Sequence, residues 1–356
     1  MSTLTVDLDA IAANWRWLRQ QHGRATAAIV KADAYGLGAL AVAPRLFAEG
    51  ARHFFVAYPQ EGAELRPSLP GAMIAVLNGF LEPQADLYLA HNLAPVLGNL
   101  GEIAAWSAQA AQLGRSLPAL IHIDTGMNRL GLPPAELARL TAEPERLTGI
   151  DAAFVMTHLI NAEIPRDAGN MAQAKRLAAA AALLPQVPRS LANSSGILLG
   201  PDYASSLARP GAAAYGLNPT PGQPNPMRTV LRLTAPVLQL REIEPGQSVG
   251  YNALWTAQRP TRVATVSCGY ADGYHRALTH RAFASFDGAR LPLIGRVSMD
   301  LATFDATDHP AITQGSELEL IGPAIPPDEV AAWANTNGYE ILTSLKPRAG
   351  RIYAPL

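Results

Sequence analysis

The chain has little cysteine and little charge. Its 356 residues include one cysteine, Cys268, so no internal disulfide can form, and no Cys/His cluster has the spacing of a zinc site. Charged residues make up 16% of the chain and the formal net charge is -1, which gives no global field to attract nucleic acid or an anionic membrane. No apolar run reaches the roughly 18 residues of a membrane helix, and the broken, acidic start does not resemble a signal peptide. We therefore expect a soluble cytoplasmic protein with no metal, nucleic-acid or membrane partner.

Apolar residues are abundant, at 49% of a chain long enough for two domains. In the first two-thirds, short apolar runs alternate with amphipathic stretches, which indicates parallel strands joined by helices. The expected strands are 27–31, 53–57, 72–76, 94–98, 119–124, 151–157, 189–193 and 212–217, and the expected helices include 39–49, 60–65, 102–113, 134–140 and 170–184. Eight such strands predict a closed (β/α)8 TIM-like barrel, with an open doubly wound sheet as the alternative. No G-x-G-x-x-G opens a unit, which argues against a dinucleotide-binding fold.

The pattern of alternating strands and helices ends near residue 219. Four prolines punctuate a linker there: Pro219, Pro221, Pro224 and Pro226. The remainder is β-rich, with strands expected over 230–242, 261–268, 283–286, 291–295, 301–305 and 317–321, one helix over 328–335, and a hairpin turn at Asp287-Gly288. We predict a barrel domain over 1–222 and a mainly-β domain over 223–356, with the first ~10 residues able to pack against the second.

The strongest local signal is the segment Ile-Val-Lys-Ala-Asp-Ala-Tyr-Gly-Leu-Gly at 29–38. Lys31 stands at the end of the first expected strand, and barrel active sites lie at that end of the strands. A lysine is costly to bury unless it is paired or chemically used, and an unprotonated lysine can form an imine with an aldehyde cofactor. From position alone, a strand-end lysine that extends to water is the favoured alternative.

This segment resembles the pyridoxal 5'-phosphate (PLP) attachment motif of alanine racemases, which are fold type III PLP enzymes, although Asp33 and Leu37 stand where the usual motif has Asn and His. Further segments resemble the same family in the same order: 124–131 (Asp-Thr-Gly-Met-Asn-Arg-Leu-Gly), 156–158, 192–194, 208–211, 215–216, 250–251, 269–273 and 295–300. The resemblance spans nearly the whole chain. It implies a PLP-dependent racemase of alanine that works as a homodimer with shared active sites and supplies D-alanine for peptidoglycan.

The resemblance implies two catalytic bases. Racemisation removes a proton from one face of the substrate Cα and returns it on the other, so Lys31 would serve one face and Tyr251 of the partner subunit the other. A free tyrosine has a pKa of about 10, and His158 and Arg209 are the expected neighbours that activate it. Arg209 would also face the pyridine nitrogen and keep it unprotonated, because a guanidinium accepts no proton. Read without the resemblance, Tyr251 is favoured as a packed strand aromatic, while for Arg209 a surface ion pair at a loop is as well supported as a functional role in a shaped loop.

The resemblance also implies a phosphate site and a substrate site. Barrel phosphate sites commonly use the last two strand ends, and the expected cofactor contacts are Tyr35, Asn193, Ser194, Arg209, Gly211 and Ala212. Arg129 would bind the carboxylate of the amino-acid substrate through paired donors. From the partner subunit, Met299 would offer its backbone N–H to that carboxylate, Tyr270 would narrow the entrance, and Asp300 would support Met299.

Two positions near the expected pocket depart from the family. His122 stands where many relatives have a lysine that becomes carbamylated and orients the arginine matching Arg129, so Arg129 is held by another anion, by His122 itself, or less firmly. Pro347 stands where some relatives have a phosphate-contacting tyrosine. The substrate therefore stays open between alanine, serine and a broader set. A PLP-dependent decarboxylase and a non-catalytic PLP carrier, which would lack the second domain, are the alternatives from other classes.

Overall fold

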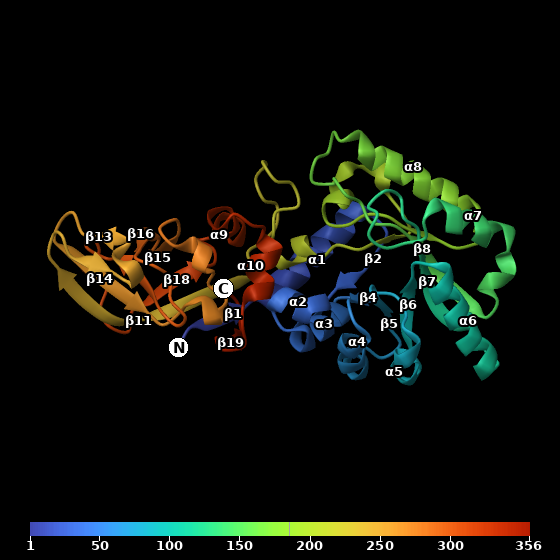
Figure 1. The fold of residues 1–356 in the computed structure, drawn as a ribbon, viewed down its shortest axis with the longest axis horizontal. Helices are drawn as coiled ribbons and strands as arrows, with labels where there is room; N and C mark the ends of the chain where they lie inside the picture. Colours follow the sequence, from blue (N-terminus) through green and yellow to red (C-terminus); the bar gives the residue numbers. More distant parts are fainter. Residues whose placement is uncertain (185) are drawn as a thin grey trace.

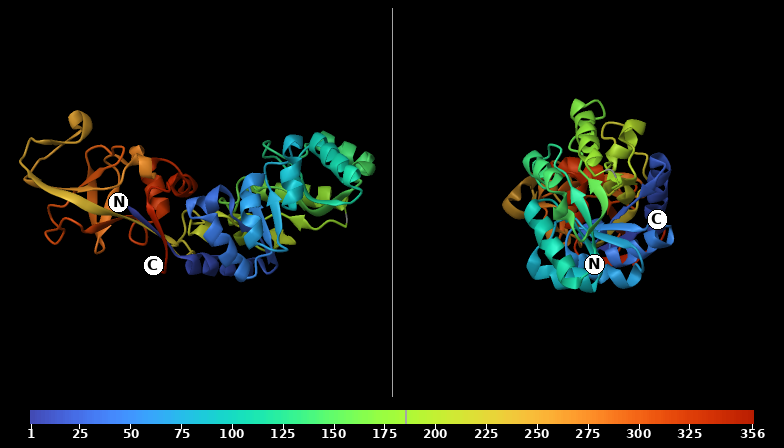
Figure 2. Two further views of the ribbon diagram at one scale, coloured as in Figure 1. Left: turned by 90° about the horizontal axis from the view of Figure 1, so that it is seen from below. Right: turned by 90° about the vertical axis from the view of Figure 1, so that its right-hand side faces the viewer.

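The computed structural model describes residues 1–184 and 186–356, and the chain folds into two parts (Figure 1). The barrel lies at one end of an elongated molecule and the β-rich part at the other, as Figure 2 shows. Strands from the two chain ends, β1 (Thr3–Val6) and β19 (Gly350–Tyr353), pair in parallel in the β-rich part. Within the described residues, no helix has both the length and the apolar character needed to cross a membrane.

The first part is a parallel barrel. Its strands are β2 (Ala25–Thr26), β3 (Ala28–Ile29), β4 (His53–Val56), β5 (Met73–Val76), β6 (Leu93–Leu97), β7 (Leu117–His122), β8 (Ile150–Met156), β9 (Arg189–Ser190) and β10 (Leu207–Ala208). The hydrogen-bonded order runs from β2 through β10 down to β3, and only Ala27 separates β2 from β3 along the chain. The ends of the sheet therefore meet, and the expected (β/α)8 TIM-like barrel is confirmed.

Helices surround the barrel, and several begin and end at capping residues. They are α1 (Leu8–His22), α2 (Lys31–Gly36), α3 (Ala39–Ala48), α4 (Pro59–Leu65), α5 (Ala85–Ala90), α6 (Leu100–Leu113), α7 (Pro134–Ala142) and α8 (Ala168–Ala182). Helix α1 is not among the expected helices. Asp7 caps its start by accepting a hydrogen bond from the Ala10 N–H at 2.8 Å, and Gly23 ends it with a φ of 69°. Its buried Trp15 donates to the Ala27 carbonyl at 3.0 Å, which ties α1 to the first barrel strand.

The expected strand over 212–217 is wrong. These residues form a 3-10 helix, η6 (Ala212–Tyr215), and β10 takes the eighth place in the barrel. The run is apolar because η6 is buried, and a short buried run carries no periodicity that separates strand from helix. The other short 3-10 helices are η1 (Arg66–Ser68), η2 (Glu82–Gln84), η3 (Pro144–Leu147), η4 (Ser195–Leu199), η5 (Pro201–Tyr203), η7 (Tyr251–Ala253), η8 (Tyr270–Asp272) and η9 (Arg276–Leu278).

The second part is built on an antiparallel sheet, as expected for a mainly-β domain. Its further strands are β11 (Leu231–Ile243), β14 (Thr261–Val266), β15 (Phe283–Phe286), β16 (Ala289–Ile294), β17 (Ala302–Asp305) and β18 (Glu317–Ile321), with β12 (Ser248–Val249) and β13 (Trp255–Thr256) as a separate hairpin. The sheet closes on itself because β14 pairs with both β17 and β11. Asp287 and Gly288 both have positive φ in the turn between β15 and β16. Two helices, α9 (Pro327–Ala334) and α10 (Gly338–Ser344), follow β18.

Candidate active site

The barrel residues that the sequence predicts for the site line one cavity. It has a volume of about 310 Å³, and the barrel side of its wall is built from segments at or after the ends of strands β3, β5, β7, β8, β9 and β10. The predicted residues on this wall are Lys31, Tyr35, Arg129, His158, Asn193, Ser194, Arg209, Gly211 and Ala212. Because they come from five strand ends that are far apart in the sequence, it is barrel formation that brings them together.

Lys31 follows β3 closely and begins a turn of unusual handedness. The next four residues, 32–35, have φ between 52° and 56°, in the left-handed region. This conformation costs L-residues roughly 1–2 kcal/mol each, so neighbouring contacts must hold it. Gly36 completes the turn with a φ of 81°, and a Cβ at that position would lie 2.4 Å from the carbonyl oxygen of Leu342. The lysine is thus placed by a turn that only a folded environment can maintain.

The surroundings of the Lys31 amine favour its neutral form. Burial lowers the pKa of Lys31, the Arg129 cation lowers it further, and Glu61 acts in the opposite direction. A lower pKa increases the fraction of neutral amine near pH 7, which is the form that attacks an aldehyde. The environment therefore suits a lysine used as a nucleophile better than one that simply extends to water.

Two groups that line the cavity, the buried Arg209 and the half-buried His158, keep different charges. The Arg209 guanidinium donates to the Ser190 hydroxyl and to the Thr157 carbonyl. Burial lowers its pKa to about 10, so it stays a cation at neutral pH. Burial, together with Arg209 and the other nearby cations, lowers the pKa of His158 to about 3, so the imidazole stays neutral. The surface ion pair considered for Arg209 is wrong, because the residue is only 4% exposed.

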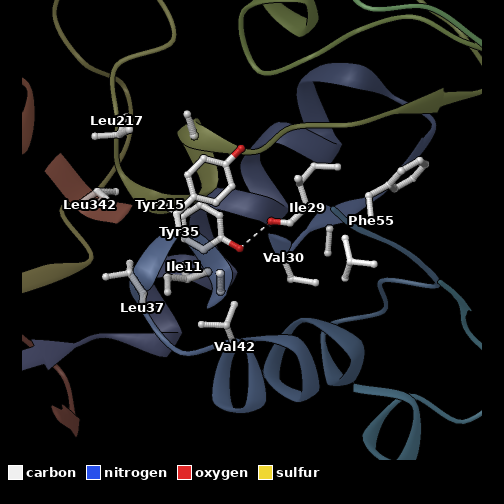
Figure 3. Close-up of a cluster of buried hydrophobic side chains, with 14 of the residues drawn as sticks. Ile11, Ile29, Val30, Tyr35, Leu37, Val42, Phe55, Tyr215, Leu217 and Leu342 are labelled. Carbon is white, nitrogen blue, oxygen red and sulfur yellow. Dashed lines mark hydrogen bonds between the residues drawn. The ribbon is translucent and has the colours of Figure 1, made fainter. Parts of the chain in front are cut away.

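One region of the cavity wall gathers hydroxyl groups and backbone donors. The buried Ser194 hydroxyl accepts hydrogen bonds from the N–H groups of Gly211 at 3.1 Å and Ala213 at 3.2 Å. Tyr35 stacks on Tyr215 with ring centroids 4.7 Å apart (Figure 3). A Cβ at position 211 would lie 2.2 Å from the Tyr35 hydroxyl, so glycine leaves room for that hydroxyl. This set of donors without carboxylates fits a phosphate group.

Asn193 and Ala212 belong to the two loops that carry these donors. The Asn193 side-chain oxygen accepts a hydrogen bond from the Gly196 N–H at 2.8 Å and orders the start of η4. Ala212 is the first residue of η6. Among the residues that the structure describes, no group of three His, Cys, Asp or Glu side chains is placed to hold a metal ion.

Helix α10 contributes cavity residues that sequence reasoning missed. Tyr339 and Thr343 reach the wall from the second part of the chain, and the Tyr339 ring lies 6.2 Å from that of Tyr35. The signal for this helix was Asn337, whose side chain accepts a hydrogen bond from the Glu340 N–H at 3.1 Å and caps the helix start. Nothing in the short pattern that follows Asn337 indicated that the helix would face the barrel.

Arg129 borders the main cavity and a second hollow behind it. The second hollow, of about 180 Å³, is also lined by His122 and Glu102. Burial, with the charge of Arg209, lowers the pKa of His122 to about 4, so His122 is neutral near pH 7. Among the described residues, the Arg129 guanidinium makes no hydrogen bond or ion pair, so neither His122 nor Glu102 of this hollow is bonded to it.

The remaining predicted residues, Tyr251, Tyr270, Met299 and Asp300, lie in the second part and outside the cavity wall. Tyr251 is 69% exposed on η7, next to β13 at the far end of the molecule (Figure 1). The packed strand aromatic considered for Tyr251 is therefore wrong. Tyr270 and Met299 are also exposed, while Asp300 pairs with Arg348 at 2.8 Å. One chain does not bring these residues to Lys31, and their contribution from a partner subunit stays a prediction.

Family models match both parts of the chain. A model described as "Alanine racemase, N-terminal domain" matches residues 6–219, and one described as "Alanine racemase, C-terminal domain" matches residues 230–353. The chain is 52% identical over 350 residues to the alanine racemase of Acidiphilium cryptum, covering 98% of both chains. It is 46% identical over 354 residues to a catabolic alanine racemase of Agrobacterium fabrum, covering 98% of this chain and 91% of that one.

Comparison with solved structures also finds alanine racemases. The crystal structure of alanine racemase from Bartonella henselae with covalently bound pyridoxal phosphate superimposes with a TM-score of 0.95 at 40% identity, covering 99% of both chains. That of the biosynthetic alanine racemase from Pseudomonas aeruginosa superimposes with a TM-score of 0.91 at 34% identity, with the same coverage. The similarity extends over both the barrel and the β-rich part.

Proposed function

The chain belongs to the alanine racemase family and is a PLP-dependent isomerase of alanine, and we propose that its two bases are Lys31 and the partner subunit's Tyr251. The observation that carries the assignment is the single cavity at the strand ends, where a half-buried lysine, a buried arginine and a set of phosphate donors meet. Both family domains are present, which does not fit the non-catalytic carrier considered above.

Different cavity residues would hold different parts of the cofactor. When bound, PLP supplies an aldehyde that captures amino groups and a ring that withdraws electrons from the substrate Cα. Lys31 would hold the cofactor through its amine, and Ser194, Tyr35 and the backbone near Gly211 would hold its phosphate. Arg209 would lie against the pyridine nitrogen. Because a guanidinium only donates hydrogen bonds and accepts no proton, it would keep that nitrogen unprotonated. A weaker electron sink at that nitrogen would disfavour side reactions such as transamination.

Proton transfer needs one group on each face of the substrate Cα. Lys31 Nζ would move a proton on one face, and Oη of the partner subunit's Tyr251 on the other. Arg129 would bind the substrate carboxylate, and the partner subunit's Met299 would add a backbone N–H to it. Tyr270 and Asp300 of the partner subunit would complete the entrance. The exposure of Tyr251 and Met299 in one chain supports this arrangement, because exposed groups can reach a second copy.

Borohydride reduction of the PLP-loaded protein tests the central assignment. Reduction makes the link between lysine and cofactor permanent, and peptide mapping is expected to find the label on Lys31. Label on another lysine, or a protein that binds no PLP, would disprove the role of Lys31. Chiral analysis of L-alanine, L-serine and a wider panel after incubation then decides between alanine and a broader substrate range.

We also propose that the D-alanine is made in the cytoplasm and used for peptidoglycan. Support for a biosynthetic role is divided, because similar proteins include a catabolic racemase as well as a biosynthetic one. A bacterial strain without this gene is expected to need D-alanine for growth. Growth without D-alanine, together with failure to use alanine as a carbon source, would favour the catabolic role.

A further inference from the structure

We propose that Glu61 is a positioning residue for Lys31, because its carboxylate fastens the left-handed turn after Lys31 to the neighbouring barrel strand and places a negative charge beside the peptide bond that follows Lys31. This inference rests on the proposed role of Lys31 as the cofactor-holding residue. It adds a residue that touches neither substrate nor cofactor and that acts through Lys31.

The turn needs an external support on its lysine side. Residues 32–35 all have positive φ, and L-residues rarely adopt this conformation in succession. Ala32 is the first of them and adjoins Lys31 directly. Its backbone N–H donates to Oε1 of Glu61 at 2.6 Å. A side chain from another element therefore holds the turn at its first residue.

The second oxygen of the same carboxylate is anchored on the adjacent strand. Glu61 Oε2 accepts hydrogen bonds from the N–H groups of Ala57 at 2.7 Å and Tyr58 at 3.1 Å, where β4 leads into α4. Strand β4 pairs with β3, the strand that precedes Lys31. The carboxylate thus bridges the ends of two neighbouring strands, and both of its oxygens are used. An amide in its place would offer one acceptor oxygen and turn an NH2 toward an N–H group.

The far end of the turn is fastened independently. Asp33 accepts a hydrogen bond from the Ala39 N–H at 2.7 Å and pairs with Arg351 of β19 at 3.1 Å. Arg351 also donates to the Gly36 carbonyl at 2.8 Å. Because these contacts hold the end away from Lys31, removal of Glu61 should loosen the lysine side of the turn and leave the rest in place.

The charge of Glu61 matters in addition to its hydrogen bonds. The charged groups that act on Lys31 are the Arg129 cation and the Glu61 carboxylate, while His158, which follows β8, is neutral near pH 7. Arg129 lowers the pKa of the lysine nitrogen and Glu61 raises it. Neutralising Glu61 should therefore make this nitrogen easier to deprotonate. If Glu61 only capped α4, its neutralisation would leave the Lys31 nitrogen unchanged. This difference separates a positioning role from a capping role.

The test compares Glu61→Gln with Glu64→Gln, an exposed glutamate on the same helix, in the PLP-loaded full-length protein. One readout is the pH at which the visible absorbance of the lysine-linked cofactor fades, and the other is the rate of PLP loss after dilution. For Glu61→Gln we expect the fading pH to fall, PLP loss to accelerate roughly tenfold to a hundredfold, and kcat to fall more than KM changes. The Glu64→Gln variant should match the parent in all three.

Glu61→Asp provides a second variant that keeps the charge on a shorter side chain. We expect Glu61→Asp to lose PLP faster than the parent, while its visible absorbance fades at the same pH as that of the parent. This variant also keeps the proposal testable if Glu61→Gln fails to fold. An unchanged fading pH in a folded Glu61→Gln variant would show that Glu61 only caps α4, and an unchanged rate of PLP loss in Glu61→Asp would show that it does not hold the turn; either result would overturn the proposal. A parent protein that carries no PLP on Lys31 would instead disprove the proposed function itself.

Discussion

Single residues at the cavity show how burial adjusts charge without removing it. Arg209 keeps its charge although burial lowers its pKa to about 10, and His158 loses its charge because burial lowers its pKa to about 3. The pKa of Lys31 is also lowered, by burial and by Arg129, although Glu61 acts in the opposite direction. The cavity therefore offers a fixed cation, a neutral imidazole and a lysine ready to react, each from its position in the barrel.

The glycine at position 211 should be essential for cofactor binding. In Gly211→Ala the new Cβ would lie 2.2 Å from the Tyr35 hydroxyl, so the Tyr35 ring would have to leave its stacked position on Tyr215. We expect destabilisation of about 1–3 kcal/mol and weaker binding of PLP. Thermal unfolding and PLP titration measure both quantities.

Gly350→Ala is the matched control, because a Cβ at that position meets only the Ser2 carbonyl at an ordinary 3.9 Å. If Gly211→Ala binds PLP as tightly as this control, the phosphate pocket has been placed wrongly.

At the scale of elements, Arg348 connects the segments that carry the exposed residues proposed for the substrate entrance. It pairs with Asp300 at 2.8 Å and with the buried Asp272 of η8 at 3.3 Å. Asp272 in turn accepts a hydrogen bond from the Gly269 N–H at 2.9 Å. Arg348 thereby joins the segments of Tyr270 and Met299 to the chain that follows α10.

Arg348→Ala should disturb substrate binding more than cofactor binding. Because Arg348 is about half exposed, its ion pairs are partly screened, and we expect a rise in KM of only a few-fold. Steady-state kinetics should show this change while the absorbance of bound PLP stays at the parent value. Arg259→Ala, which removes an exposed pair with Asp308, serves as control. Loss of PLP in Arg348→Ala would contradict the prediction that Arg348 acts on substrate binding and not on cofactor binding.

At the scale of the whole molecule, the proposed contribution of the partner subunit's Tyr251 to the cavity predicts that activity depends on assembly. Lys31→Ala and Tyr251→Phe subunits should each be inactive alone. After subunit exchange, a hybrid dimer would hold one intact site, so the mixture should recover about a quarter of the parent activity. Activity assays before and after mixing measure this recovery. A mixture that stays inactive would exclude a site shared between two copies.

Stability should depend on pH through two half-buried histidines, His158 and His122. His158 and His122 have pKa values of about 3 and about 4 in the folded protein, against about 6.5 in an unfolded chain. The unfolded chain therefore binds protons first as the pH falls. Stability is complete above about pH 6.5 and decreases toward pH 4, by up to ~1.4 kcal/mol per pH unit for each histidine.

Urea unfolding at several pH values measures this decrease. The decrease should be shallower in His158→Asn, while the exposed His280→Asn variant should follow the parent. Equal slopes in all three proteins would show that His158 does not resist protonation in the folded state.

The sequence by itself determined the barrel, the β-rich second part and the set of residues at the strand ends. Alternating apolar runs specify parallel strands, and a short motif places a lysine at one strand end, because these patterns depend on neighbours along the chain. The same local reasoning assigned 212–217 to a strand and missed α1 and α10, since a buried apolar run or a short helix has no periodicity of its own.

Only the tertiary structure decided which side chains meet. The contact of Glu61 with the turn after Lys31, the pair between Asp33 and Arg351, and the approach of Tyr339 to Tyr35 all join residues from different elements. The left-handed turn itself is unfavourable for its own sequence and persists because these contacts hold it. Such contacts arise from the closing of the barrel and the packing of the second part against it, and no pattern along the chain encodes that geometry.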